Sequence, residues 1–358
     1  MELYILNDKF QEIACIDEFE SVLWTKFFRD VGYCEIHTLF DTELWDLLKI
    51  GYYITRKDDD MACIITKKSI ETDVENGDYL TVYAVDVKSI LNRRIVWNDI
   101  NVKDVSISTF IHTVLNENVK SPTMSDRAIP NFTIDLSGSS DFNKYSNITY
   151  STNKDNVLKL ITDLCTDYNI GFQVILKDGK FIFKLLDRVI KYDTSKNNYV
   201  EFSPEFSNIL SSDYEETDES YKNVCLIGGE KKDNNQEFAT YPQTISPRGL
   251  ERREIYNDSG LSKTYKDESG VEHTYTDEEY KKLLLDNGRV VLSNNSFNES
   301  FTGEVDIIDT YTYKKDYNIG DMVVVRNNYG ISTIATISSV MESEDIENKY
   351  QVEPHFEY

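Results

Sequence analysis

Histidines and cysteines are the residues of this chain that could ligate a metal ion or act as nucleophile and base. No two histidines have the HxH, HExxH or HxxxH spacing that brings imidazoles to one metal ion. No two cysteines lie closer than 19 positions, which excludes a CxxC zinc site and argues against a disulfide framework. A Cys/His peptidase stays open, because it requires only that one of each meet in the folded chain. The residues concerned are His37, His112, His273, His355, Cys15, Cys34, Cys63, Cys165 and Cys225.

The acidic residues could imitate calcium loops or glycosidase sites where they cluster, at 58–60, 213–219 and 342–347. None of these clusters has the twelve-residue spacing of a calcium loop. A carboxylate pair for glycoside hydrolysis is defined by a separation of about 5–9.5 Å, which a sequence does not show. Because the chain has 63 acidic residues, we interpret the clusters as solvated surface.

Enzyme signatures of other kinds are missing as well. The sequence contains no GxSxG, GxxxxGK[ST] or GxGxxG string, so the usual grounds for an α/β hydrolase or a nucleotide-binding loop do not exist. We therefore predict no catalytic, cofactor-binding or metal-binding residue, no cofactor and no enzymatic activity. Each cysteine has apolar neighbours, and we expect buried thiols that pack as small hydrophobic side chains.

The composition is that of a globular protein with several domains. The chain has 358 residues, of which 40% are hydrophobic and 28% charged, and it is long enough for two to four domains. Its net charge of −25 repels phosphate, so we expect no sequence-specific nucleic-acid binding. We also predict no signal peptide, no membrane insertion and folding in a reducing cytoplasm.

Short runs of β-branched and aromatic residues, separated by turn signals, fill the first hundred residues. Closely spaced strands of this kind predict an antiparallel sandwich or barrel. Asp41 can cap a short helix that ends near Gly51. Strands return after residue 290, so we expect two β modules at opposite ends of the chain.

The middle of the chain has helical periodicity. Residues 156–168 carry apolar side chains at i, i+3, i+4, i+7 and i+8, which predicts a helix with one buried face. A second helix is predicted at 108–118. Two strands at 171–176 and 181–185 flank Asp178-Gly179, a strong hairpin signal.

The stretch at 230–275 is polar and has little apolar periodicity, so we expect a long exposed loop or insertion. Thr276 and Glu279 have the spacing of a capping box, which predicts a helix that reaches 287–288. The predicted fold class is α+β and mainly β, with two antiparallel β-barrel or sandwich domains. The predicted boundaries are 1–95 for the first β domain, 96–195 for an α+β middle domain, 196–230 with 290–358 for the second β domain, and 231–289 for a polar loop and helical insertion.

Several short strings occur in a fixed order along nearly the whole chain. They are SVLW (21–24), GYCEI (32–36), LNRRIVW (91–97), DRV (187–189), VEFS (200–203) with FSNI (206–209), YKNV (221–224) leading to Gly228-Gly229, GLERRE (249–254) and YNIGDMV (317–323). In this order and spacing they resemble phage tail hub proteins of the siphovirus tail-associated type, which also occur as baseplate hubs of contractile tails and phage-like injection systems.

The resemblance implies a homotrimeric ring in the virion tail or baseplate, assembled in the bacterial host cytoplasm. In this family two tube-like β domains per subunit give the trimer a pseudo-sixfold face for the tail tube, with a threefold spike or tip on the other side. The implied partners are further copies of the chain, a tail tube or tube-initiator protein, a spike or tip protein, and tape-measure and baseplate wedge proteins. Relatives often carry a C-terminal wall-degrading or adhesin domain; because this chain stops soon after its last β module, we expect a hub without one.

Eleven residues of these strings are candidate structural or interface residues. They are Trp24, Gly32, Arg93, Arg94, Trp97, Arg188, Asn208, Asn223, Gly228, Gly320 and Asp321. For Arg93 and Arg94 we expect ion pairs with Asp or Glu of the same or a neighbouring subunit. Gly320-Asp321 predicts a tight turn that enters a strand, and Gly228 a bend or strand end.

Two other functions remain open at this stage. One is a tail-tip peptidoglycan hydrolase with a dispersed Glu/Asp site. The other is a receptor-binding tail component that recognises surface polysaccharide through its tyrosines, since 12% of the residues are aromatic. Strand-rich proteins and subunit interfaces also favour aromatic residues, so the composition does not require a sugar site.

Overall fold

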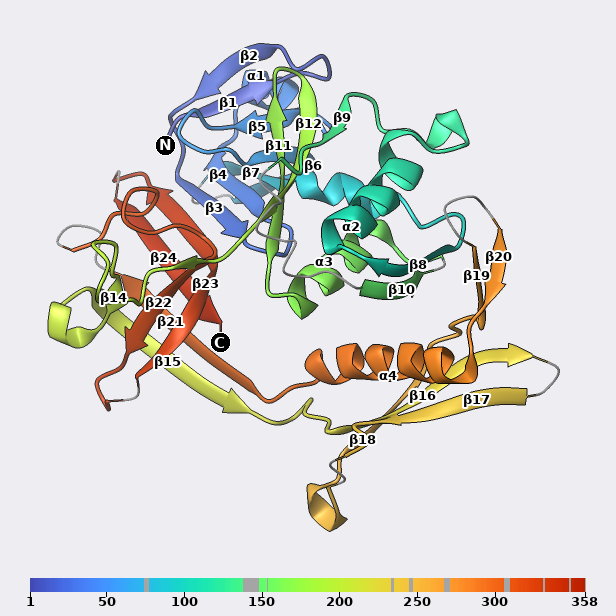
Figure 1. Cartoon of the computed structure of the whole chain (residues 1–358). Coiled ribbons are helices and arrows are strands. Elements are labelled where there is room, and N and C mark those ends of the chain that lie inside the picture. The colour runs from blue at the N-terminus through green and yellow to red at the C-terminus, as the bar shows by residue number, and fades with distance from the viewer. Residues whose placement is uncertain are drawn as a thin grey trace.

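The computed structural model describes the whole chain except residues 74–76, 138–147, 153, 233–234, 245–246, 267–270, 306–309, 331, 348 and 358. The fold is mainly β, as predicted, and its buried hydrophobic side chains form four clusters. Two clusters belong to β modules at the two ends of the chain, one to a middle domain and one to an insertion (Figure 1). None of the described helices is long and apolar enough to span a membrane.

A single sheet of fourteen strands contains both β modules. The N-terminal β module comprises β1 (Leu3–Leu6), β2 (Glu12–Ile16), β3 (Ser21–Phe27), β4 (Tyr33–Leu39), β5 (Tyr53–Thr55), β6 (Ala62–Asp73), β7 (Gly77–Asp86) and the helix α1 (Thr42–Leu47). The C-terminal β module comprises β13 (Val189–Ile190), β14 (Glu201–Phe202), the 3-10 turn η5 (Pro204–Phe206), β15 (Ile209–Thr217), β21 (Asn298–Val305), β22 (Asp321–Arg326), β23 (Ser332–Asp345) and β24 (Tyr350–Glu357). The main path runs β15-β21-β24-β23-β3-β4-β7-β6-β5-β1-β2, and β13, β14 and β22 attach through β23.

The two modules join where β3 pairs with β23. The pairing is antiparallel and runs from Phe27 opposite Ser339 to Ser21 opposite Asp345. We call this junction the seam. Because successive side chains of a strand point to opposite faces, the register fixes which residues of the two modules share a side of the sheet. Trp24 of the N-terminal core therefore shares one face with Glu342, its partner across the seam.

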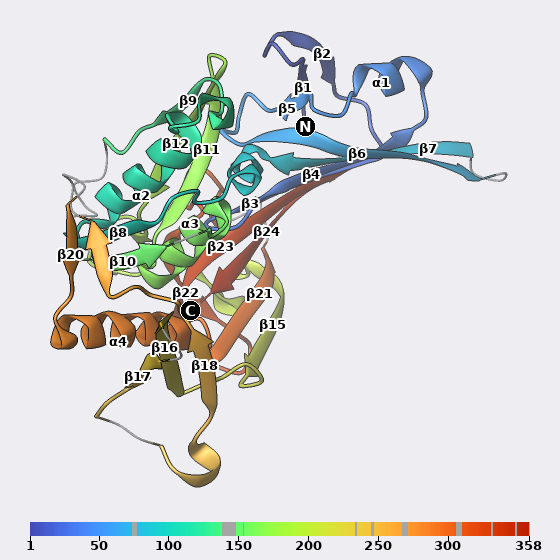
Figure 2. The same cartoon turned by 90° about the vertical axis from the view of Figure 1, so that its right-hand side faces the viewer.

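Both hydrophobic cores of the β modules lie on that same face of the sheet. Leu23, Glu35, Tyr83, Met341 and Glu353 belong to the opposite face by register, and all five are partly exposed. We call this second surface the open face. In Figure 2 no helix is drawn below and to the right of β4 and β7.

The middle domain packs two helices against small sheets. It contains the 3-10 turn η1 (Val87–Arg93), β8 (Ile100–Val105), α2 (Ile107–Leu115), the π turn η2 (Asn116–Lys120), the 3-10 turn η3 (Ser125–Arg127), β9 (Phe132–Ile134), β10 (Ile148–Thr152), α3 (Val157–Asp167), β11 (Gly171–Lys177) and β12 (Lys180–Leu186). The predicted helix at 156–168 is confirmed, with Asn156 as its N-cap. The predicted hairpin is confirmed as well: Asp178 and Gly179 adopt φ of +51° and +67°, which suits a tight turn between antiparallel strands.

The stretch at 230–275 was predicted as a long exposed loop or insertion; strands occupy much of it, so a loop without regular structure is wrong and an insertion is what the structure has. Three strands form a sheet and a helix packs on it: β16 (Val224–Lys232), β17 (Asn235–Tyr241), β18 (Glu254–Asp258) and α4 (Asp277–Ser293); the 3-10 turn η6 (Gly249–Glu251) and the pair β19 (Thr264–Lys266) and β20 (Glu272–Thr274) complete it. The capping box of Thr276 and Glu279 is confirmed, and α4 runs past the predicted end to Ser293. The parts of the stretch at 233–234, 245–246 and 267–270 lie outside the described residues.

The cysteines are not all buried, contrary to the prediction. Cys15 is exposed on the edge strand β2, whereas the other four are buried. An edge strand has one side of its backbone free and carries exposed side chains. The apolar neighbours of Cys15 in the sequence therefore predicted its burial wrongly. All five thiols are free.

Candidate structural site: the seam between the two β modules

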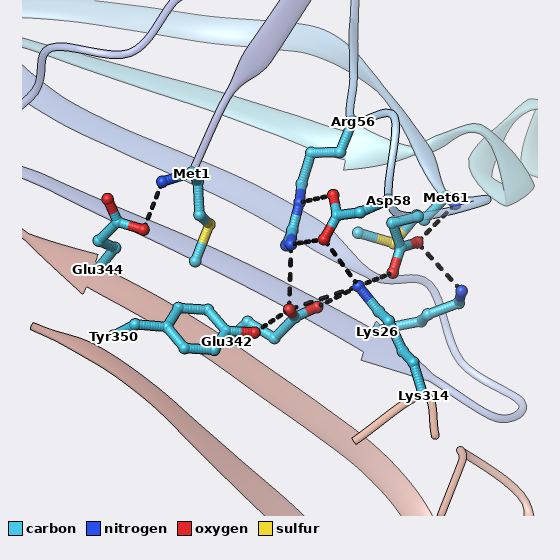
Figure 3. A network of polar contacts seen from close by, with 10 residues as sticks. Met1, Lys26, Arg56, Asp58, Met61, Lys314, Glu342, Glu344 and Tyr350 are labelled. Atoms are coloured by element: carbon cyan, nitrogen blue, oxygen red, sulfur yellow. Dashed lines mark hydrogen bonds and ion pairs between the residues drawn. The ribbon is translucent and has the colours of Figure 1, made fainter. Parts of the chain in front are cut away.

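A network of charged side chains crosses the seam on the core face of the sheet (Figure 3). The Arg56 guanidinium, after β5, lies 3.1 Å from the Glu342 carboxylate on β23 and 2.5 Å from that of Asp58. Lys314, in the segment before β22, lies 3.2 Å from Glu342 and 3.0 Å from Asp59. The network thus links a turn of the N-terminal module to two elements of the C-terminal module.

Burial makes this network energetically different from a surface ion pair. The side chains of Glu342, Arg56 and Asp59 are 2%, 4% and 0% exposed, and a charge buried this deeply is tolerated only when it is paired and hydrogen-bonded. Burial raises the pKa of the Asp59 carboxyl, but Lys26 and Lys314 outweigh it and hold that pKa below its ordinary value. The Tyr350 hydroxyl donates a further hydrogen bond to Glu342.

Trp24 is the candidate residue that the structure places in the seam. It is fully buried, and the Arg56 guanidinium lies 5.4 Å from its ring centroid. A guanidinium over an indole face adds a cation–π attraction that grows when water is excluded. The interpretation of 58–60 and 342–347 as solvated surface is therefore wrong for Asp59 and Glu342, whose burial depends on the pairing of β3 with β23.

Phe28, which follows β3, is held between two glycines from different parts of the molecule. A methyl group at Gly171 of β11 or at Gly320 before β22 would overlap the Phe28 ring. The Phe28 backbone donates to the carbonyl of Ser338 and accepts from the amide of Phe172. The ring therefore packs where the N-terminal module, the middle domain and the C-terminal module meet.

Lys88 of the middle domain and Arg29, which follows β3 in the N-terminal module, stabilise the same junction. The Lys88 ammonium donates to the carbonyls of Phe27 and Asp30, at 2.8 and 3.0 Å, and burial lowers its pKa to about 8. Arg29 donates to the Ile170 carbonyl and pairs with the Glu357 carboxylate. Carbonyl groups at the end of a strand would otherwise be unsatisfied where they are buried.

Gly320 and Asp321 form the predicted turn at the entrance to β22. Gly320 has φ of +86°, a conformation that side-chain-bearing residues rarely adopt, and the Asp321 amide donates to the Asn318 carbonyl. The Asp321 carboxylate is buried and accepts from the Asn318 amide at 2.8 Å. It also lies 4.0 Å from the Lys191 ammonium.

Gly32 and Gly228 are both close-contact positions. A side chain at Gly32 would overlap the Thr25 carbonyl and the Met61 sulfur, and one at Gly228 would overlap Gln236 and Tyr256. Gly228 lies within β16 at an irregularity of its pairing with β17, between Gly228 and Lys231, which agrees with the predicted bend.

Asn208, Asn223 and Arg188 have local roles. Asn208 is buried and bridges backbone groups, donating to the Glu201 carbonyl and accepting from the Ser203 amide. Asn223 bridges the backbone of 251 and 253 in the same manner. The Arg188 backbone amide donates to the Asp187 carboxylate. None of the three lies at the seam.

Arg93, Arg94 and Trp97 lie at the boundary of the N-terminal module with the middle domain. Arg94 donates to the backbone carbonyls of Arg127 and Arg93. Neither Arg93 nor Arg94 forms an ion pair with a residue that the structure describes, so an ion pair with an acidic residue within the chain is not found there. Trp97 is 46% exposed.

A shallow hollow of about 510 Å³ lies on the open face at the seam. Thr25, Tyr33, Met341 and His355 are among the residues that line it. It therefore touches β3, β4, β23 and β24, which belong to both modules. Among the residues that the structure describes, no group of three or more His, Cys, Asp or Glu is arranged to hold a metal ion.

The pattern of a protein family matches residues 2–356 of the sequence, described as Siphovirus ReqiPepy6 Gp37-like protein. The chain belongs to this family. The resemblance that the short strings indicated is therefore confirmed at the level of the family, over residues 2–356.

Three solved structures are similar over nearly their full lengths. The tail protein from Neisseria meningitidis MC58 has a TM-score of 0.56 and 9% identity, covering 100% of this chain and 96% of its own. The prophage tail protein gp18 from Listeria monocytogenes EGD-e has a TM-score of 0.55 and 13% identity; the match covers 100% of this chain and 94% of that protein. The 43 kDa tail protein of prophage MuSo2 from Shewanella oneidensis has a TM-score of 0.56 and 10% identity; the match covers 99% of this chain and 98% of that protein. The Gp37-like chain therefore has the fold of phage tail proteins. A comparison with curated proteins gives no match.

Proposed function

We propose that the chain is the structural hub of a phage tail or of a phage-like contractile particle. In this proposal three copies close into a ring that joins the sixfold tail tube to a threefold spike or tip and encloses the central channel. The observation that carries the proposal is the seam: β3 and β23 unite two β modules of one chain into one sheet. Three such chains present six modules, which is what a sixfold partner requires.

The free edges of the sheet support a ring. The main path ends at β15 on one side and at β2 on the other, and uncovered edge strands tend to associate with other chains. A closed ring in which the edge of one copy meets the opposite edge of the next removes both edges. An obligate interface of this kind buries about 2,000 Å² or more.

The open face suits a channel wall. Its side chains are partly exposed and include the carboxylates of Glu35, Asp345 and Glu353, so it is more acidic than basic, like the chain as a whole. Carboxylates on the wall repel DNA that passes through. In this proposal the hollow at the seam faces the bore.

The proposed role is non-enzymatic, and its partners are the tail tube or tube-initiator protein and the spike or tip protein, with tape-measure and wedge proteins as further candidates. The names of the three similar structures, all tail proteins, support the tail as the location. A division into four domains, as predicted from the sequence, is part of this proposal.

Cryo-electron microscopy of the particle tests the hub. We expect three copies around an open bore with Glu35 and Glu353 on its wall. A position at the periphery, or a basic wall, would contradict the proposal. Zymography of the isolated chain on peptidoglycan tests the hydrolase alternative, and clearing would favour the enzyme; glycan-array binding would favour a receptor-binding component.

A further inference from the structure

An arginine cluster lies beside the edge of the sheet that ends in β2. Arg93 ends η1, Arg94 follows it, and Arg127 ends η3. Arg94 and Arg127 are fixed by backbone carbonyls: Arg94 donates to the Arg127 carbonyl at 2.6 Å, and Arg127 to the Ile95 carbonyl at 2.7 Å. Arg127 also lies 4.8 Å from the ring centroid of Trp97.

The Arg93 side chain has no hydrogen-bond or ion-pair partner among the described residues. It is exposed and lines a cavity of about 390 Å³ together with Arg94, Asp8, Phe10, Tyr53 and Phe181. Asp8 is the only carboxylate among the described lining residues, and it forms no ion pair there. In a chain with 63 acidic and 38 basic residues, a cluster of three guanidinium groups without a carboxylate partner points to an acidic group from another molecule.

The rim of the cluster has the composition of a protein interface. Ile95, Trp97 and Met124 are 38%, 46% and 39% exposed, and all three belong to the segments that carry Arg94 and Arg127. Arginine and tryptophan are the residues that most often dominate binding between proteins. A small free anion would leave this apolar rim in water, so the rim favours a polypeptide as the occupant.

The opposite edge of the same sheet carries carboxylates that lack partners. Asp213 and Glu215 lie on the edge strand β15, are exposed, and have no cation partner among the described residues. In Figure 1 β15 lies at the lower left, whereas β8, to the right of the centre, and β9, above it, follow the arginine-bearing segments. A ring built by rotation needs two different complementary patches on opposite sides of one chain.

We propose that Arg93, with Arg94 and Arg127, binds Asp213 and Glu215 on β15 of the neighbouring copy. The inference rests on the proposed ring and names the charged contact between its subunits. Each copy contributes its basic cluster to one neighbour and its acidic edge to the other, so the contact repeats around the ring without a second kind of interface.

The test reverses the charges on each side and then on both. Arg93→Glu is the cleanest single change because the Arg93 side chain makes no hydrogen bond or ion pair with a described residue. Lys177→Glu, at an exposed hairpin residue, is the control with the same change in charge. Sedimentation of the full-length chain over a range of concentrations measures assembly. We expect Arg93→Glu and the Asp213→Lys/Glu215→Lys pair each to raise the concentration at half-assembly about tenfold. The triple variant that combines them should return to within about threefold of the wild type.

The outcomes separate the inference from the ring on which it rests. A wild-type chain that stays monomeric at every concentration would overturn the ring and this contact with it. A wild-type trimer that Arg93→Glu leaves unchanged, or a triple variant weaker than either parent, would overturn the contact alone. If Arg93→Glu abolishes binding of a labelled duplex oligonucleotide at low salt and leaves the trimer intact, the cluster serves nucleic acid and the proposal is wrong.

Discussion

Replacing Glu342 by glutamine tests whether the buried charges hold the seam together. The substitution keeps the shape of the side chain but leaves the Arg56 guanidinium and the Lys314 ammonium with one carboxylate fewer in a site where Glu342 is 2% exposed. Removing one partner of a buried pair costs about 3–5 kcal/mol. Because Arg56 keeps Asp58 and Lys314 keeps Asp59, we expect the lower end, about 3 kcal/mol.

Urea unfolding followed by circular dichroism, with hydrogen exchange of the β3 and β23 amides, measures this loss. The matched control is Asp163→Asn, which breaks the exposed pair of Lys159 and Asp163 on α3 and should cost about 0.5 kcal/mol or less. Glu342→Gln should also speed exchange in β3 and β23 selectively. The reasoning is refuted if Glu342→Gln costs no more than the control, or if exchange rises equally throughout the sheet.

Two further predictions concern the junction and its pH dependence. Gly320→Ala should lower the free energy of unfolding by about 3 kcal/mol because the added methyl group meets the Phe28 ring. The control Gly330→Ala, which has a similar positive φ but open space around it, should cost only about 1 kcal/mol in calorimetry. Equal losses would contradict the prediction by showing that the Phe28 ring has room to move. Burial alone would raise the pKa values of the Asp58 and Asp59 carboxyls, but their cation partners outweigh burial and lower both pKa values. The unfolded chain therefore takes up protons first as the pH falls. The contribution of Asp58 and Asp59 to the free energy of unfolding is thus complete above about pH 4 and decreases below it. Amides of the seam that are equally protected from hydrogen exchange at pH 6 and at pH 3 would contradict this prediction.

Local signals in the sequence predicted the local structure correctly. The helix capped by Asn156, the turn at Asp178-Gly179 and the capping box of Thr276 and Glu279 each depend on residues within a few positions of one another. Their hydrogen bonds join residues that are close in the sequence, so they can be predicted from the sequence without knowing where distant segments pack.

The seam was not predictable in the same way. Arg56 and Glu342 are 286 positions apart, and an acidic run looks the same whether it is solvated or buried. Only the register of β3 against β23 decides that Glu342 faces the core while Met341 faces the open side. The strands of the insertion escaped prediction for a related reason: β17 buries only Ala239, so its pattern lacks the alternation that identifies a half-buried strand.

The pairing of β3 with β23 predicts where the proposed hub can and cannot flex. Backbone pairing along the whole of β3 joins one β module to the other, so the described seam leaves no hinge between these two strands at which one module could tilt against the other. If three copies form the proposed hub, any mismatch between a threefold and a sixfold neighbour is absorbed outside the subunit, at the contacts that copies make with each other and with the tube. The rigid unit of such a particle is the pair of modules, and its adaptable parts are the joints around it.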